Sequence, residues 1–244
     1  MSQATLRCIG PFMTLVFFVA TSGRAQYVPG RYEVGLSVGA LVYTGDLTPN
    51  PVGSVQLAQP VVGLQVTKLL GATTGLRAEV AYGSLRGNDA VYQEPAWRSQ
   101  RAFAFNGNVT ELTVSGIWQR AYSRKLRPYL LAGAGLALTR INRDYSSFNT
   151  DYFSAEPDVI QGLEEDKARQ TPRAIIIFPV GVGAQYRFLP RWSVTAEGAL
   201  RLMRTDYLDG FSRAANPQLA DYYSRIAIGV SYNMGGVNRL NCPR

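Results

Sequence analysis

The chain contains no histidine, and this is its most informative absence. Histidine is the usual general base, the proton shuttle of a Ser-His-Asp triad and the commonest zinc ligand. Its absence disfavours a hydrolase or a zinc enzyme, because both classes use histidine most often. The sequence therefore points away from an enzyme, and neither a cofactor nor a metal is expected.

Cysteine and charge are also scarce. The two cysteines, Cys8 and Cys242, cannot build a disulfide framework, because Cys8 lies in a segment that we expect to be cleaved. Charged residues make up only 17% of the chain, whereas 46% is hydrophobic, with 24 glycines and 14 tyrosines. This composition favours a single β-rich domain.

No apolar run is long enough for a membrane-spanning helix. The run Pro11–Ala20 follows Arg7 and precedes the small residues around Ala25. This order predicts a secretory signal peptide over residues 1–25, so that the mature chain begins at Gln26 outside the cytoplasm.

What the chain does contain is a long alternation of apolar and polar residues. Between Arg173 and Arg204, apart from a break at Leu189-Pro190-Arg191, apolar residues recur at every second position. This pattern predicts two strands joined by a tight turn. The polar face consists mostly of small residues with Glu197 and Arg201, which is too sparse for a solvated surface. The pattern is typical of membrane-barrel strands, with the apolar face toward lipid and the polar face toward a narrow lumen.

The same alternation recurs along the chain and predicts an all-β, eight-stranded antiparallel outer-membrane β-barrel over residues 26–234, followed by a basic tail at 235–244. Apolar residues predicted to face lipid occupy even positions. Connections alternate long and short, and two of the long ones are expected as loops over residues 84–101 and 142–172. Because outer-membrane barrels have short periplasmic turns and long external loops, we expect both termini in the periplasm. A soluble ligand-binding barrel would instead put its large apolar residues inside, so it is disfavoured.

Six charged residues are predicted to face the lumen, and their signs balance. A barrel this small has just enough interior for side chains, so we expect them to pair in a buried network. A proton path or a catalytic dyad is the weaker alternative. The six are Arg77, Glu79, Glu111, Glu197, Arg201 and Arg225.

The remaining charges sort by compartment. The external loops hold most of the acids, including the run Glu164-Glu165-Asp166, which we interpret as a solvated loop rather than a cation site. The periplasmic side carries ten basic residues, opposed only by Glu33. They are Arg31, Lys68, Arg120, Arg124, Lys125, Arg127, Arg187, Arg191, Arg239 and Arg244.

Two interpretations of this basic side remain open: anchoring among lipid headgroup phosphates, and docking of an acidic periplasmic protein. The residues expected to form a docking face are Arg120, Arg124, Lys125, Arg127, Arg191 and Arg239. Nucleic acid is not expected as a partner of an exported barrel.

Several motifs resemble a known family. They are Tyr43-Thr44-Gly45-Asp46-Leu47, Glu111, Arg124-Lys125-Leu126-Arg127-Pro128-Tyr129-Leu130, Gly181-Val182-Gly183-Ala184-Gln185-Tyr186 and Thr205-Asp206-Tyr207-Leu208-Asp209. Together they resemble the PorG-like family, the small outer-membrane barrel component of the type IX secretion system of Bacteroidetes. The resemblance implies outer-membrane lipid and periplasmic ring subunits as partners, and a role in protein secretion and gliding motility. The alternative is a structural or adhesive OmpA-like small barrel without a secretion role.

Overall fold

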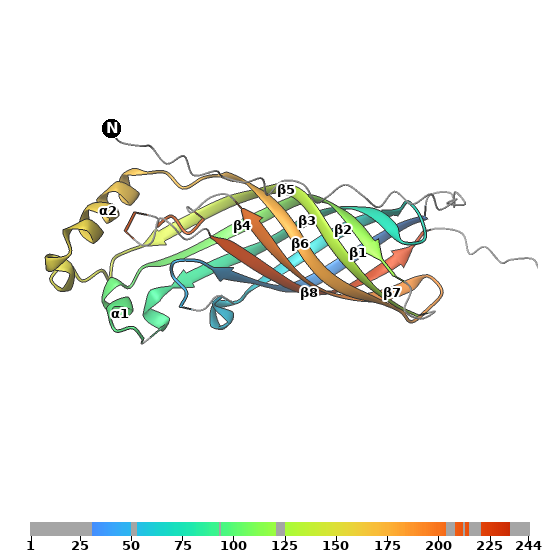
Figure 1. Ribbon diagram of the computed structural model, residues 1–244, viewed down its shortest axis with the longest axis horizontal. Helices are drawn as coiled ribbons and strands as arrows, with labels where there is room; N and C mark the ends of the chain where they lie inside the picture. Colours follow the sequence, from blue (N-terminus) through green and yellow to red (C-terminus); the bar gives the residue numbers. More distant parts are fainter. Residues whose placement is uncertain are drawn as a thin grey trace, which may run out of the picture.

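Eight antiparallel strands close into one barrel in sequential order, with β1 pairing with β8 (Figure 1). The computed structural model describes residues 31–49, 53–92, 94–120, 125–203, 208–211, 213–214 and 221–234. The strands are β1 (Arg31–Thr44), β2 (Gln59–Leu69), β3 (Thr74–Asn88), β4 (Ala104–Gln119), β5 (Leu126–Asp144), β6 (Ala174–Arg187), β7 (Trp192–Met203) and β8 (Tyr222–Asn233). The predicted fold class is confirmed.

The two ends of the barrel differ. The turn end carries the short connections of residues 70–73 and 188–191 together with Arg31 and Met234, the first and last described residues. The loop end carries the short helical segments, as Figure 1 shows for α1 and α2. These segments are η1 (Val55–Leu57), η2 (Asp89–Val91), α1 (Trp97–Arg101), η3 (Tyr152–Ala155) and α2 (Pro157–Ala168). None of the described helices combines the length and the apolar character needed to cross a membrane.

The outer surface of the barrel is apolar and the inner surface is polar over most of its length. On β4, Leu112, Val114 and Trp118 point outward with 43%, 53% and 54% of their surface exposed, whereas the intervening Thr113 and Ser115 are buried. The same alternation holds on all eight strands, with the even-numbered residues outward. An exposed apolar band of this extent is far larger than a water-soluble monomer tolerates, so the band faces lipid and the barrel spans a membrane.

Aromatic side chains mark the edges of the apolar band. Tyr82 is exposed at the loop end. At the turn end the rings of Trp192 and Tyr232 are in edge contact, with centroids 5.0 Å apart. The other exposed aromatic residues at the turn end are Tyr32, Trp118, Tyr186 and Phe188. Such girdles are expected where a barrel crosses the two membrane interfaces.

Two predicted loop boundaries are wrong. Strand β3 continues to Asn88 and β5 continues to Asp144, and both pair with β4 over this extra length. The residues still alternate, but with inverted polarity: beyond the apolar band the polar residues face outward and the apolar ones face inward. The predicted loop 142–172 also contains η3 and α2. Because the polarity reverses here, these residues break the rule that even positions are apolar, and the sequence pattern therefore ends the strands too early.

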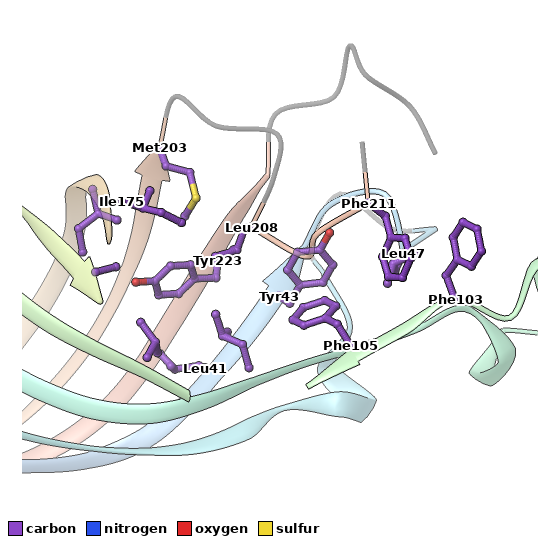
Figure 2. Packing of buried hydrophobic residues seen from close by; sticks show 14 of the residues in the cluster. Leu41, Tyr43, Leu47, Phe103, Phe105, Ile175, Met203, Leu208, Phe211 and Tyr223 are labelled. Carbon is purple, nitrogen blue, oxygen red and sulfur yellow. The ribbon is translucent and has the colours of Figure 1, made fainter. Parts of the chain in front are cut away.

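The interior is layered. Polar and charged side chains fill the middle of the lumen, and a hydrophobic cluster fills its loop end. The cluster draws Leu41 and Tyr43 from β1, Phe105 from β4, Tyr223 from β8 and Phe211 from the last loop (Figure 2). The loop end of the barrel is therefore closed by a packed core.

Candidate functional site

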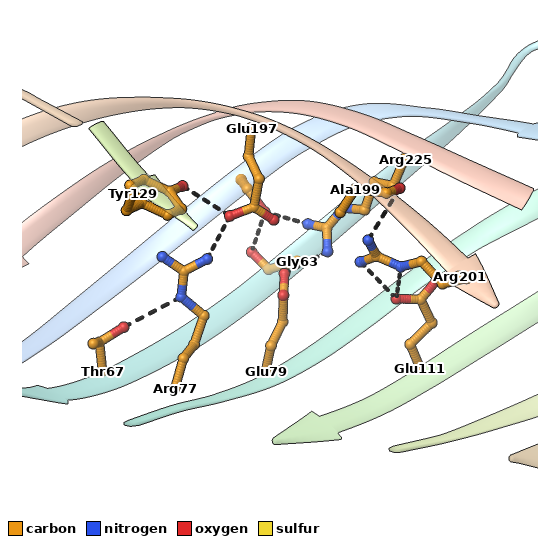
Figure 3. Close-up of polar contacts among 11 residues, drawn as sticks. Gly63, Thr67, Arg77, Glu79, Glu111, Tyr129, Glu197, Ala199, Arg201 and Arg225 are labelled. Atoms are coloured by element: carbon orange, nitrogen blue, oxygen red, sulfur yellow. Dashed lines mark hydrogen bonds and ion pairs between the residues drawn. The ribbon is translucent and has the colours of Figure 1, made fainter. Parts of the chain in front are cut away.

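The six charged residues predicted for the lumen form three ion pairs inside the barrel (Figure 3). A guanidinium nitrogen lies 2.5 Å from a carboxylate oxygen in both Arg77–Glu197 and Arg225–Glu79, and 3.1 Å in Arg201–Glu111. All six side chains are buried or nearly so. Each charge is thus matched by a partner, as buried charges must be.

Neutral groups complete the hydrogen bonding of these pairs. The Tyr129 hydroxyl donates to Glu197 at 2.8 Å, and Arg77 donates to the Thr67 hydroxyl at 3.3 Å. Arg225 donates to the Ser37 hydroxyl at 2.6 Å. These bonds fix the orientation of the guanidinium groups, which favours a structural role over a mobile proton path.

Glycines make room for this network. A Cβ atom at Gly63 would lie 2.6 Å from Arg225 Nη2 and 2.9 Å from Glu79 Oε1. A Cβ atom at Gly183 would lie 2.4 Å from the Tyr129 ring. The small-residue face of the strands is therefore the surface against which the long lumen side chains pack.

A polar hollow lies between the network and the turn end. It is small, with a volume of about 20 Å³, and it is lined by Glu33, Gln65, Tyr129 and Gln185, among others. Glu33, predicted to oppose the basic periplasmic residues, is buried here and accepts hydrogen bonds from Gln185 at 3.0 Å and Asn233 at 3.1 Å. Water can therefore reach the lumen only from the turn end, because the charge network and the hydrophobic cluster fill the rest of it.

Reconstitution into planar bilayers should give no steady open-channel conductance. An ion would have to pass three fixed ion pairs and then a packed apolar core, and an eight-stranded barrel has no spare interior beside them. Single-channel recording over long intervals at high salt is the measurement. Reproducible, large conductance steps from purified protein would contradict the closed lumen.

The loops at the loop end fold into a cap. The Tyr43 hydroxyl lies 2.7 Å from Asp209 Oδ2 and 2.8 Å from Asp221 Oδ1. The hydroxyl has one proton, so it donates to only one of the two carboxylates at a time. Burial, together with the charge of Asp221, raises the pKa of Asp209 well above its ordinary value. The loop between β7 and β8 is thereby held to the end of β1 at the barrel mouth.

The structure brings two of the family-like motifs into contact in this cap. Leu47 is fully buried in the hydrophobic cluster. Next to Tyr43, the backbone amide of Gly45 donates a hydrogen bond to the Thr48 hydroxyl. From the other motif, Leu208 donates its amide to Asp221 at 3.0 Å. Asp46 is buried beside them. Thr205, Asp206 and Tyr207 lie outside the described residues.

The interpretation of the run Glu164-Glu165-Asp166 as solvated is wrong for Asp166, and another loop acid, Asp89, is buried as well. Asp89 is fully buried, with Arg98 at 2.9 Å and Arg101 at 2.6 Å. Asp166, from the acidic run, is buried on α2 and accepts the Ala214 amide at 3.0 Å. Asp89 joins η2 to α1 within the connection between β3 and β4, and Asp166 joins the β5–β6 loop to the β7–β8 loop. Among the described residues no group of three potential ligands is arranged to hold a metal ion.

A stack of aromatic rings supports the same cap. The rings of Phe103 and Phe211 are parallel, with centroids 4.5 Å apart, and Phe148 lies against Phe103 at 5.6 Å. Phe153 continues the stack at 5.2 Å from Phe148. The sequence interpretation did not find this cap. The phenylalanines within the predicted loops are the signal that could have indicated it.

The predicted docking face lies at the turn end as far as it is described. Arg120, Lys125 and Arg191 are exposed there, whereas Arg127 is half-buried. Backbone hydrogen bonds hold the described residues beside these positions: Arg120 donates its amide to Pro128 at 3.1 Å, and Arg187 to Lys125 at 2.8 Å. Arg124 and Arg239 lie outside the described residues. No exposed carboxylate lies at this end of the described chain.

The match to a protein family decides where this chain belongs. The family described as "Domain of unknown function (DUF6089)" matches residues 10–230. The chain belongs to the DUF6089 family. No curated protein matches this DUF6089 sequence.

Solved barrels resemble this DUF6089 member only distantly. Ail of Yersinia pestis, solved in complex with the heparin analogue sucrose octasulfate, is 10% identical with a TM-score of 0.47; the match covers 84% of this chain and 99% of Ail. Neisserial surface protein A is 12% identical with a TM-score of 0.48, covering 82% and 96% of the two chains. The N-terminal β-barrel domain of Pseudomonas aeruginosa OprF is 12% identical with a TM-score of 0.40, covering 84% and 100%. With similarity this low, nothing that those barrels bind is transferred to this chain.

Proposed function

We propose that the protein is a non-enzymatic outer-membrane barrel that anchors a periplasmic protein assembly from its turn end. The observation that carries this proposal is the charge asymmetry of the turn end. Arg120, Lys125 and Arg191 are exposed there, and the single acid of this end, Glu33, is withdrawn into the lumen. A rim of positively charged side chains on a rigid barrel attracts a negatively charged partner and orients it.

The closed lumen supports an anchoring role rather than transport. The charge network and the hydrophobic cluster leave the protein with two surfaces for contact with other molecules, namely the two ends, besides the lipid-facing band. At the turn end, which we place in the periplasm with both termini, the fixed backbone of residues 120 and 125–128 presents the basic side chains without loop movement.

The resemblance to the PorG-like family supports a specific identity for this partner. On this proposal the acidic partner is the periplasmic ring of the type IX secretion system, which the barrel anchors or stabilises at the outer membrane. The second candidate is a structural or adhesive barrel. The folded cap at the loop end favours it, because ordered loops present a fixed surface to the cell exterior.

Reversal of the exposed basic charges should separate these functions. The variant R120E/K125E/R191E alters no lipid-facing apolar residue and no lumen pair, so the barrel should still assemble. We expect weaker, salt-dependent crosslinking to ring subunits, and type IX cargo retained in the periplasm, since rim charges act through screened attraction. The matched control is R169E/R173E/R213E, which makes the same charge change at the loop end.

The comparison is made at equal amounts of barrel in the outer membrane. Headgroup anchoring alone predicts that secretion follows barrel abundance and returns to normal once abundance is matched. Normal secretion and normal crosslinking by the turn-end variant at matched abundance would refute docking at this rim and favour the structural barrel.

A further inference from the structure

The outward face of β3, β4 and β5 changes character where these strands leave the apolar band. Along β3 the outward residues change from Val80 and Tyr82 to Ser84, Arg86 and Asn88. In register with them, β4 presents Asn108 and Asn106, and β5 presents Arg140 and Asn142. We call these two rows the polar extension: Ser84, Asn108 and Arg140 in the first row, and Arg86, Asn106 and Asn142 in the second.

The polar extension carries two positive charges and no negative one. Arg86 and Arg140 are exposed and make no ion pair with any residue of the described chain. The nearest acid in register is Asp144, one row further out, which accepts two hydrogen bonds from Ser146. A solvated sheet usually places opposite charges on neighbouring strands. Here the cross-strand neighbours of both arginines are asparagines, which leaves both guanidinium groups open to an anionic ligand from outside the chain.

The depth of these residues points to the lipid headgroups. Arg140 follows the outward residue Leu138 by two positions, and Arg86 follows Tyr82 by four. At about 3.4 Å per residue, this places them roughly 7 and 14 Å along tilted strands beyond the apolar band. For strands tilted by about 45°, these distances correspond to about 5 and 10 Å along the membrane normal. The headgroup layer is about 5–7 Å thick on each side, so the backbone of Arg140 lies within it and that of Arg86 lies just beyond it, at a distance that the arginine side chain spans.

The chemistry of the face selects the partner. From strand spacing and rise, the two arginine positions are about 12 Å apart. A guanidinium binds phosphate through two parallel hydrogen bonds, and asparagine amides both donate to and accept from hydroxyl groups. A protein partner would need an apolar or aromatic anchor, and the two rows contain none.

We propose that the polar extension binds the headgroup of a phosphorylated glycolipid in the leaflet at the loop end, with Arg86 and Arg140 on its phosphates and the asparagines on its sugar hydroxyls. The proposal shares with the proposed function only the placement of the loop end at the cell exterior. The polar extension would then be a second lipid contact beyond the apolar band, and it would be specific for phosphorylated sugar headgroups.

The test uses the full chain in phosphatidylcholine nanodiscs doped with lipid A, a diglucosamine lipid with two phosphates. Lipid A retained per barrel after detergent exchange is measured by native mass spectrometry. Each lost guanidinium–phosphate contact should weaken retention by about tenfold, so R86Q/R140Q should retain little, while R169Q/R213Q, the charge-matched control in the cap, retains as much as the wild type. Heat-modifiable gel mobility confirms that all three proteins are folded.

Two results would overturn the proposal: equal retention by R86Q/R140Q and the wild type, and equal retention of phosphatidylglycerol, a phosphate lipid without sugar, in place of lipid A. Either result leaves the docking proposal untouched, because R86Q/R140Q keeps the turn-end rim intact. Conversely, normal cargo secretion by R120E/K125E/R191E would refute docking without changing lipid A retention.

Discussion

Arg201→Ala should destabilise the barrel by about 3–5 kcal/mol, because it leaves the Glu111 carboxylate buried without its cation. Arg201 and Glu111 are each 1% exposed, and both Nε and Nη2 of Arg201 donate to the same carboxylate oxygen, at 3.2 and 3.1 Å. In this water-poor layer the unpaired charge cannot be solvated. The free energy of unfolding, measured by urea titration in lipid vesicles, should fall accordingly.

Two further variants show whether the loss comes from the stranded charge. Lys167→Ala removes a surface ion pair with Glu164, formed at 2.7 Å on an exposed helix face, and should cost only about 0–1 kcal/mol. The double variant E111L/R201M removes both charges while keeping apolar volume, and should recover much of the loss. If Arg201→Ala unfolds at the same urea concentration as the Lys167 variant, the pair is solvated and the network does not close the lumen.

Phe105→Ala should open the cap at the loop end, at a cost of about 3–5 kcal/mol. Phe105 is 2% exposed and contacts the Tyr43 ring edge-on, with centroids 4.9 Å apart and planes at 82°. Truncation leaves a cavity at the point where β4 supports the loops that follow β1 and β7. Beyond the apolar band no lipid chain can fill that cavity, so the lost packing is not replaced.

Trypsin sensitivity gives a local measure of this opening. Arg98 and Arg101 are buried in the native cap through their pairing with Asp89, and they should become cleavable in the Phe105 variant. The matched control is Leu112→Ala on the same strand, which faces lipid with 43% of its surface exposed. Acyl chains can fill the space left there, so both its stability and its resistance to trypsin should stay close to wild type. Equal sensitivity of the two variants would mean that the cap is not held by its aromatic core.

The membrane barrel, and the side of its wall on which each residue lies, follow from the amino-acid sequence alone. A strand has a period of two, so the alternation around Val180 and Val194 assigns every side chain to one face or the other without any tertiary information. The sparse charges then had to occupy the narrow inside. For this reason Arg77, Glu111, Arg201 and the other three lumen residues could be named from the sequence alone.

Which charges pair, and where the apolar band ends, depends on the three-dimensional arrangement of the strands. Period two gives the face of a residue but not its height, so neither the pairing of Arg201 with Glu111 nor the polarity reversal beyond Tyr82 follows from the alternation. The cap depends on contacts between distant segments, such as Tyr43 with Asp209, which are 166 residues apart. Such contacts form only when closure of the barrel brings the loops together at one end. Local secondary-structure propensity does not encode them.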